Sequence, residues 1–384
     1  MLDTRRVLLL IETSKSYGRA LLEGIGRYVE AHGRWSLYVE ERGLSDPQPA
    51  WLRRWQGDGI IFRSYSPALV QAVNTCGVPA VDTNSRISGH GFPLVYTDEV
   101  AVAEAAVAHF RDRRFERFAF CAIEDEPWVR LRREAYLAEL ARLGLACDCL
   151  YVPTGNARSG WERQQRQMAE WVTGLPKPVA ILAANDVAGM RLLDACNSAD
   201  VAVPEQAAVL GVDNDEILNK LASPPMSSID LDAIRIGYQA AALLGRLMHG
   251  DAPPDEPIFL PPAGVITRKS TDITAVQDPE LAAALMFIRR HACDGITVHE
   301  VVRHVSISRA TLERRFADQL HRSPYEEISR VRMEHVQRML AMTDYTLDDI
   351  ARQTGFRTAS HLSTAFKHRT GQSPSDFRSR REIP

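Results

Sequence analysis

The C-terminal third of the chain contains a repeated stretch of sequence. Residues 345–378 read YTLDDIARQTGFRTASHLSTAFKHRTGQSPSDFR, and residues 301–324 read VVRHVSISRATLERRFADQLHRSP. Two pairs of matching residues are each 50 positions apart, Phe316 with Phe366 and Pro324 with Pro374. Because chance rarely produces a fixed period of this length, we interpret the stretches as two copies of one structural unit.

Each copy has the pattern of a helix, a tight turn and a second helix. Gly355 supplies a left-handed residue for the turn of the second copy, a conformation that glycine adopts without strain. Ser306 stands at that place in the first copy, so we expect that turn to be slightly less stable. The second helix of each copy starts with polar residues and has an apolar Leu and Phe face. This arrangement is typical of a helix that enters the DNA major groove, about 12 Å wide.

A long helix expected over residues 325–342 joins the two units. It would let them enter successive major grooves on one face of the DNA, about 34 Å apart. Residues 278–384 hold 17 Lys and Arg against 14 Asp and Glu, whereas the rest of the chain holds 29 against 35. A basic segment suits a phosphate-rich partner. The alternative is a plain helical bundle used for dimerisation, but the repeat and the turn chemistry favour binding of double-stranded DNA.

The segment 345–378 resembles the signature of the AraC/XylS transcription-factor family. The resemblance implies base contacts from two recognition helices, at Ala310, Glu313 and Arg314 in the first, and at Ala359, Ser360, His361, Ser363 and Thr364 in the second. Arg314 is the best candidate for a guanine contact, because a guanidinium group can bond O6 and N7 together. The small residues Ala310, Ala359 and Ser363 are alternatively spacers.

The first two thirds of the chain alternate between strand and helix patterns. Near-continuous apolar strands separated by amphipathic helices predict parallel sheets covered on both faces, in a two-lobed α/β fold like that of periplasmic binding proteins. Ligands of such folds bind beyond the carboxyl ends of the strands. The expected strands are 7–12, 35–40, 59–63, 78–83, 117–122, 179–184 and 208–213, and the expected helices are 17–31, 99–113, 130–143 and 187–199.

The pattern changes to helices alone after Asp278. Helices are expected over 279–292, 297–305, 308–320, 325–342, 347–354 and 359–369. A Pro-rich and then polar segment precedes them. We therefore predict a two-lobed sensor over residues 1–262, a linker over 263–277, and an all-α DNA-binding domain with two helix-turn-helix units over 278–384.

Residues suited to sugar recognition follow several of the expected strands. Arginine, carboxylate and amide groups bind vicinal hydroxyls, and an aromatic face packs against a sugar ring. The motifs around Arg130, Asn185 and Asp213 resemble the effector-binding part of LacI-type repressors and periplasmic pentose-binding proteins. Asp186 is either part of the pocket or a helix N-cap beside it. The resemblance implies a sugar site made of Lys15, Tyr17, Trp128, Arg130, Arg132, Asn185 and Asp213.

The order of the two domains is informative. LacI-type repressors carry their DNA-binding unit at the N-terminus, whereas this chain starts with the first strand of the sensor and has an AraC-type unit at its end. That order resembles the XylR-type regulator family. The resemblance implies D-xylose or a similar monosaccharide as effector, activation of pentose catabolic genes, a homodimer, and RNA polymerase as a partner. Pocket composition alone indicates only a small polyol or pentose.

Other function classes find little support. The sequence has no phosphate-binding loop and no GxSxG elbow, and His299 and His304 are five residues apart, so they cannot share one metal ion as an i, i+4 pair does. We therefore expect no enzyme, no cofactor and no metal. Six scattered cysteines and the lack of a membrane-spanning run predict reduced core thiols and a cytoplasmic protein. The alternatives are a sugar-metabolising enzyme fused to a regulatory helical domain, a repressor sensing another monosaccharide, and a sensor acting through protein partners.

Overall fold

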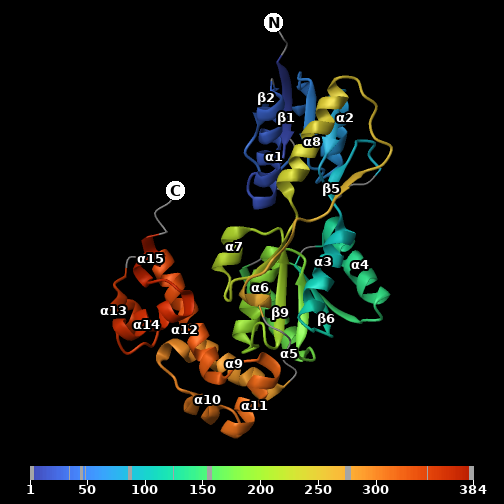
Figure 1. The fold of residues 1–384 in the computed structure, drawn as a ribbon. Coiled ribbons are helices and arrows are strands. Elements are labelled where there is room, and N and C mark those ends of the chain that lie inside the picture. Colours follow the sequence, from blue (N-terminus) through green and yellow to red (C-terminus); the bar gives the residue numbers. More distant parts are fainter. Residues whose placement is uncertain are drawn as a thin grey trace. The chain divides into compact units, whose positions relative to one another are not determined.

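The structure is a computed structural model that describes residues 4–33, 35–43, 46–47, 49–84, 89–123, 125–153, 158–272, 278–343 and 345–379. It divides into two compact units, Met1–Ile273 and Thr274–Pro384 (Figure 1). Among the described residues, no helix combines the length and the apolar character needed to cross a membrane.

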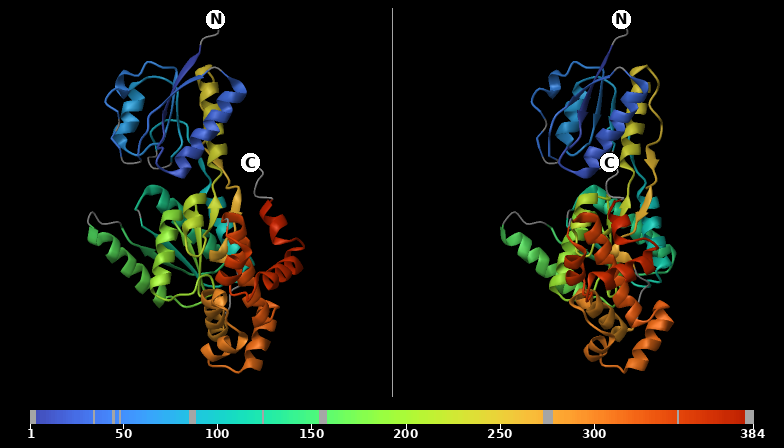
Figure 2. Two further views of the ribbon diagram at one scale, coloured as in Figure 1. Left: turned by 90° about the vertical axis from the view of Figure 1, so that its left-hand side faces the viewer. Right: turned by 60° about the vertical axis from the view of Figure 1, so that its left-hand side comes forward.

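The first lobe of the larger unit is built on a parallel four-stranded sheet of order β2-β1-β3-β4. Its central strand β1 has Val7 to Leu10 almost completely buried, because helices cover both faces of the sheet. Helices α1 and α8 pack side by side (Figure 2), and Gly24 of α1 permits this approach, since a Cβ there would overlap with the Ile234 carbonyl oxygen. The elements are β1 (Arg5–Leu10), α1 (Ser16–His32), β2 (Trp35–Val39), β3 (Gly59–Phe62), α2 (Pro67–Thr75), β4 (Ala80–Asp82) and α8 (Ala233–Met248).

The second lobe contains a six-stranded sheet of order β12-β10-β9-β8-β6-β7, parallel except for β12. A separate pair of parallel strands, β5 and β11, adjoins the first lobe (Figure 1). The elements are β5 (Val95–Thr97), α3 (Glu99–Asp112), β6 (Phe118–Ala122), α4 (Pro127–Arg142), β7 (Cys147–Tyr151), α5 (Arg158–Gly174), β8 (Val179–Ala183), α6 (Asp186–Ser198), β9 (Ala207–Val212), α7 (Glu216–Leu221), β10 (Ser227–Asp230), β11 (Ile258–Leu260) and β12 (Gly264–Ile266).

The sensor extends further along the chain than the sequence indicated. The expected linker, residues 263–277, begins with β12, which pairs with β10 in the sheet. Ser270 and Thr271 are completely buried, and the first compact unit ends at Ile273. The sequence indicated a linker here because the segment is Pro-rich and because β12 is too short to show a strand pattern. The last part of the expected linker, 273–277, lies outside the described residues.

Among its described residues the smaller unit contains helices and no strand, as predicted. Matching residues of the two copies have matching roles. Phe316 and Phe366 are both completely buried, and Ser323 and Ser373 each accept a hydrogen bond from a backbone N–H three residues later, at 3.2 and 3.1 Å. The helices are α9 (Pro279–His291), α10 (Val298–His304), α11 (Arg309–Leu320), α12 (Pro324–Met342), α13 (Leu347–Gln353), α14 (Ala359–Thr370) and α15 (Pro374–Ser379).

The turns of the two copies differ. Gly355 has a φ of +73°, as expected, and a Cβ there would lie 2.9 Å from the Cys293 carbonyl oxygen. In the first copy, α10 ends at Val305 in extended backbone with a φ of −101°. Ser306 is not among the residues with positive φ, and its N–H donates to the Glu280 carboxylate at 3.0 Å. Ser306 therefore does not adopt the left-handed conformation for which a slightly less stable turn was expected.

Candidate functional site

A cavity of about 430 Å³ lies at the carboxyl ends of the strands, with residues from both lobes of the sensor in its wall. Six of the seven predicted sugar residues line it: Lys15, Tyr17, Trp128, Arg132, Asn185 and Asp213. They come from the loop after β1 and the first turn of α1, from α4, and from just beyond the ends of β8 and β9. The parallel sheets bring these ends together, so residues far apart in sequence share one wall.

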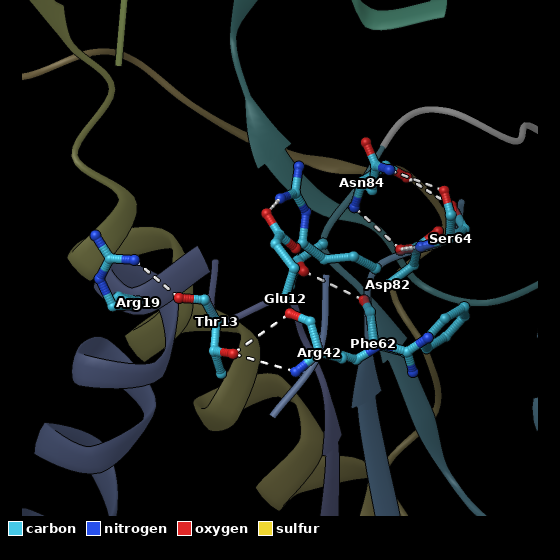
Figure 3. Close-up of polar contacts among 10 residues, drawn as sticks. Glu12, Thr13, Arg19, Arg42, Phe62, Ser64, Asp82 and Asn84 are labelled. Carbon is cyan, nitrogen blue, oxygen red and sulfur yellow. Dashed lines mark hydrogen bonds and ion pairs between the residues drawn. The ribbon is translucent and has the colours of Figure 1, made fainter. Parts of the chain in front are cut away.

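The first lobe contributes a buried ion pair that the sequence did not reveal. Arg63, just after β3, pairs with Glu12, just after β1, and both line the cavity. The Arg63 guanidinium lies 4.8 Å from the centre of the Tyr17 ring. Burial is the main reason why the pKa of Tyr17 rises to about 12, so its hydroxyl keeps its proton. The neighbouring Thr13 is tied to Arg42 by a hydrogen bond (Figure 3).

Several buried polar atoms of this first-lobe wall lack a partner. The Tyr17 hydroxyl, one carboxylate oxygen of Glu12 and the Nε of Arg63 make no hydrogen bond within the described part of the chain. Buried polar groups in proteins are nearly always hydrogen-bonded. The wall therefore has both donors and an acceptor available for a polar molecule in the cavity.

The second lobe contributes Arg132, which is held firmly. Its guanidinium donates to both carboxylate oxygens of Glu99, at 2.8 and 2.9 Å, and to the Ala184 carbonyl at 2.6 Å. Arg132 is 2% exposed and Glu99 is 9% exposed. The guanidinium also lies 5.2 Å from the Trp128 ring centre. A fixed arginine beside an aromatic face suits a polyhydroxylated ring.

Asp213 follows β9 with a φ of 107°, a strained conformation for a residue with a side chain. Its pKa rises to about 6, because burial disfavours the charge more than Arg132 and Arg63 favour it. No hydrogen bond to its carboxylate occurs within the described residues. A strained carboxylate aimed into a cavity between two arginines is an acceptor available to a ligand.

Asn185 and Asp186 have separate roles. Asn185 is the N-cap of α6, where its side-chain oxygen accepts from the Ala188 N–H at 2.9 Å, so its amide nitrogen is the group left for a ligand. The Asp186 carboxylate accepts from the Ser228 hydroxyl, the Asp215 N–H and the Asn219 amide. Of the two alternatives for Asp186, the structure therefore favours the pocket: Asp186 is among the residues that line the cavity, where it braces the strand ends, and it does not cap α6.

Arg130 differs from the sequence-based expectation. Its side chain is 53% exposed and bonds to Asp125 at 2.7 Å, and it is not among the residues that line the cavity. Arg130 and Arg132 are two residues apart on one helix, about 200° around its axis. Only one of them can face the cavity, and α4 is oriented so that Arg132 does.

The cavity wall includes functional candidates that the sequence analysis missed, chiefly Glu12, Arg63 and Tyr96. Glu12 and Arg63 are the last residues of the strands predicted over 7–12 and 59–63, so their position at a strand end could have indicated them. Tyr96 lies inside β5, a strand of three residues whose pattern is too short to stand out.

The predicted DNA-contacting residues of the first unit lie on one face of α11. Ala310, Glu313 and Arg314 are exposed, whereas Leu312 and Phe316 on the opposite face are completely buried. Glu313 accepts a hydrogen bond from Arg309 at 2.8 Å. Arg314 has no ion pair within the described residues, so its guanidinium is available to another molecule.

The second unit repeats this arrangement on α14. Ser360, His361 and Thr364 are exposed, Ala359 and Ser363 are half-buried, and Leu362 and Phe366 form the buried face. The Thr358 hydroxyl caps the helix by accepting from the His361 N–H at 3.1 Å. Both candidate recognition helices thus expose most of the predicted residues at their N-terminal halves, the part of such a helix that meets base edges.

Three segments of the chain match known domain families. Residues 6–97 match the XylR N-terminal domain, residues 107–271 the periplasmic binding protein-like domain, and residues 301–380 a helix-turn-helix domain. The second match ends at the buried Thr271, beyond the predicted end of the sensor.

Full-length relatives share this domain order. The chain is 31% identical over 382 residues to the xylose operon regulatory protein of Escherichia coli K12, covering 97% of this chain and 96% of the relative. It is 29% identical to the protein of the same name from Haemophilus influenzae, covering 97% and 98%. A solved structure described as the xylose-binding transcription activator xylR matches with a TM-score of 0.84 at 29% identity over the whole of both chains. A LacI family regulator from Bifidobacterium animalis matches 71% of the chain with a TM-score of 0.57 at 22% identity, which shows a shared fold.

Proposed function

Because the chain belongs to the family of the xylose operon regulatory proteins, we propose that it is a D-xylose-dependent activator of pentose catabolic genes. The sensor cavity would bind the sugar, and the two helix-turn-helix units would bind operator DNA. The relatives are named as transcription regulators, and regulation rather than sugar chemistry is the role proposed here.

The observation that carries this proposal is the arrangement of polar groups around the cavity. Asp213 offers an acceptor, Tyr17 and Arg63 offer unpartnered donors, and Trp128 offers an aromatic surface. Each sugar hydroxyl both donates and accepts, so it can satisfy either kind of group. A volume of about 430 Å³ suits a ligand of monosaccharide size.

A single helix supplies a route from the cavity to the end of the sensor. Helix α3 begins with Glu99, the partner of Arg132. Ten residues later, about 15 Å along the axis, His109 lies 2.8 Å from the Thr271 hydroxyl, and Arg113 donates to the Thr271 carbonyl at 2.7 Å. Thr271 is among the last described residues before the DNA-binding unit. A sugar that shifts Arg132 would therefore act on the point where the chain leaves the sensor.

Further parts of the proposal concern partners. A homodimer would place two DNA-binding units side by side, and activation requires contact with RNA polymerase. Because the target is chromosomal DNA, the protein would act in the cytoplasm without a membrane partner. The sugar would act on the protein only by binding to it, and the protein would need no cofactor.

The test is a thermal-shift screen of monosaccharides followed by sugar titrations with and without operator DNA. We expect D-xylose to stabilise the protein most, since a ligand at 100 times its Kd adds about 2.7 kcal/mol. We also expect operator DNA to tighten sugar binding by the same factor by which sugar tightens DNA binding. Equal sugar affinities in the two titrations would contradict the proposal that the sensor controls DNA binding. Chemical conversion of the sugar by the protein would favour the alternative that it is an enzyme.

A further inference from the structure

Two cysteines lie on one face of β7, the edge strand of the second-lobe sheet. Cys147 and Cys149 pair in register with Phe118 and Phe120 of β6, and side chains two residues apart in a strand point to the same side. Asp148 between them points to the other side, where it accepts from the Trp171 indole at 2.8 Å. Cys149 is exposed, contrary to the expectation that all the cysteines are core thiols.

The two thiols influence each other, and the Cys147 thiol donates to the Asp148 carbonyl at 3.5 Å. Interaction between the two cysteine side chains is the main reason why the pKa of Cys147 is raised and the pKa of Cys149 is lowered. The Arg133 guanidinium on α4 further favours the Cys149 thiolate. Cys149 is therefore the more acidic and the more accessible of the two thiols.

A third group faces the pair and has no partner of its own. The Tyr136 side chain on α4 is completely buried, and its hydroxyl makes no hydrogen bond within the described residues. The Tyr136 ring packs against Phe120 of β6, the residue in register with Cys149, and both cysteines help to raise the pKa of its hydroxyl. An unsatisfied buried hydroxyl beside two thiols is unusual in a region that has only a packing role.

The geometry excludes the two commonest uses of such a pair. A disulfide needs Cβ atoms about 3.8 Å apart, whereas side chains two residues apart on a strand are separated by about 6.6 Å of backbone, and the register with β6 fixes that spacing. A zinc site needs four ligands, and no cluster of three or more His, Cys, Asp or Glu suited to a metal occurs in the part of the chain that the structure describes.

We propose that Cys147 and Cys149 form a dithiol site for trivalent arsenicals and that its occupation weakens sugar binding. A three-coordinate arsenic centre needs two sulfur ligands besides its own substituent. With phenylarsine oxide, two As–S bonds form, the As–O bond breaks, and the oxide oxygen leaves as water with the two thiol protons. No oxidant or reductant is needed.

The link to sugar binding follows from α4. Tyr136, Arg132 and Trp128 are spaced at intervals of four residues, so they share one face of this helix. A phenylarsenic group on the cysteines would press on Arg133 and Tyr136 and displace the face that presents Arg132 to the cavity. This part of the proposal rests on the proposed function, whereas the dithiol site does not.

The test uses the full chain and phenylarsine oxide, with intact-mass spectrometry as readout. We expect one phenylarsenic group per chain, resistant to a monothiol and removed by a dithiol. Cys147→Ser and Cys149→Ser should each abolish this adduct, whereas the matched control Cys76→Ser, which removes a half-buried thiol elsewhere, should retain it. An adduct that persists in Cys149→Ser, or no adduct on the unaltered chain, overturns the site.

Measurements of sugar affinity test the link to sugar binding separately from the dithiol site. In the arsenic-bound chain we expect the Kd for D-xylose to rise at least threefold, with no change after the same treatment of Cys149→Ser. An unchanged Kd in the fully modified chain overturns the link through α4 but not the site. Failure of the untreated chain to bind any pentose counts against the proposed function, while the mass measurement still decides the dithiol site.

Discussion

The imidazole of His109 lies 2.8 Å from the hydroxyl of Thr271, although 162 residues separate them. The Thr271 hydroxyl donates to Ser227 at 2.7 Å, and Ser227 donates to the Arg268 carbonyl at 2.9 Å. The His109 Nε2 must therefore be the donor to Thr271. Burial is the main reason why the pKa of His109 falls to about 3, so the ring stays neutral. This chain of hydrogen bonds fixes the end of the sensor to α3.

The first prediction tests α3 as the route of the signal. Arg113→Ala removes the donor to the Thr271 carbonyl without touching the cavity. We expect the sugar affinity to stay within twofold of that of the unaltered chain, whereas sugar should no longer change the operator affinity. Each factor of ten lost in that effect corresponds to about 1.4 kcal/mol of coupling free energy. Fluorescence anisotropy with operator DNA, with and without sugar, measures both. Arg111→Ala, an exposed position on the same helix, is the control, and undiminished coupling in Arg113→Ala would exclude the route.

The second prediction concerns the cavity. Asp213→Asn should abolish the sugar-induced thermal shift, because it removes the charge and turns one acceptor oxygen into a donor nitrogen, which leaves a sugar hydroxyl without its partner at a cost of about 1–3 kcal/mol. Arg130→Ala should leave the shift unchanged, since that side chain pairs with Asp125 outside the cavity. Arg132→Ala is the poorer test. It leaves the buried Glu99 carboxylate unpaired, at about 3–5 kcal/mol, so it should destabilise the unliganded fold as well. A normal shift in Asp213→Asn would remove Asp213 from the site.

The third prediction concerns pH. The pKa of Asp213 is about 6 in the unliganded fold, so we expect sugar affinity to fall as pH drops below 6, because the protonated carboxyl offers a weaker acceptor. The ordinary unfolded value is about 3.9. The folded chain therefore binds the proton more tightly, and this residue lowers stability as pH rises from 4 to 6. Asp213→Asn should consequently raise the melting temperature of the unliganded protein at pH 7.5 and remove this residue's loss of stability between pH 4 and pH 6. A pH-independent Kd for the unaltered chain would contradict this role.

The fourth prediction concerns base reading. Arg314→Ala should weaken operator binding by about 1–3 kcal/mol and relax the preference at one base position. Arg314→Lys keeps the charge but loses the fork that reaches two guanine atoms, so it should retain nonspecific affinity while losing that preference. Binding to a panel of single-base operator variants measures both. An equal loss on every sequence would identify Arg314 as a phosphate contact.

The fifth prediction concerns the turn of the second unit. Gly355→Ala should destabilise the DNA-binding unit, because the added Cβ meets backbone atoms of Cys293 and Gly295 at 2.9 Å. Gly371→Ala is the matched control, since its φ of +76° is similar but its Cβ would meet open space. We expect a larger drop in melting temperature and in DNA affinity for Gly355→Ala. Equal losses in the two variants would mean that backbone conformation alone, and not close packing, requires the glycine.

The sequence predicted the elements that carry their own local pattern. Strand and helix periodicities and a fixed repeat are properties of short stretches, so the sequence predicted seven strands, four sensor helices and the two helix-turn-helix units of the tail. The predicted sensor elements correspond to β1, β2, β3, β4, β6, β8 and β9 and to α1, α3, α4 and α6. Strand-end position also placed Asp213 and Asn185 correctly in the cavity wall. Very short strands such as β5 and β12 escaped because three residues cannot establish a period.

What only the tertiary structure decided is which side chains meet. The sequence did not distinguish Arg132 from Arg130 as a sugar ligand. The orientation of α4 against the sheet directs Arg132 into the cavity and Arg130 toward solvent. Glu99 with Arg132, Glu12 with Arg63, and Thr271 with His109 are partners from distant segments. Their pairing depends on the order of strands and the rotation of helices, which long-range packing fixes and local patterns do not encode.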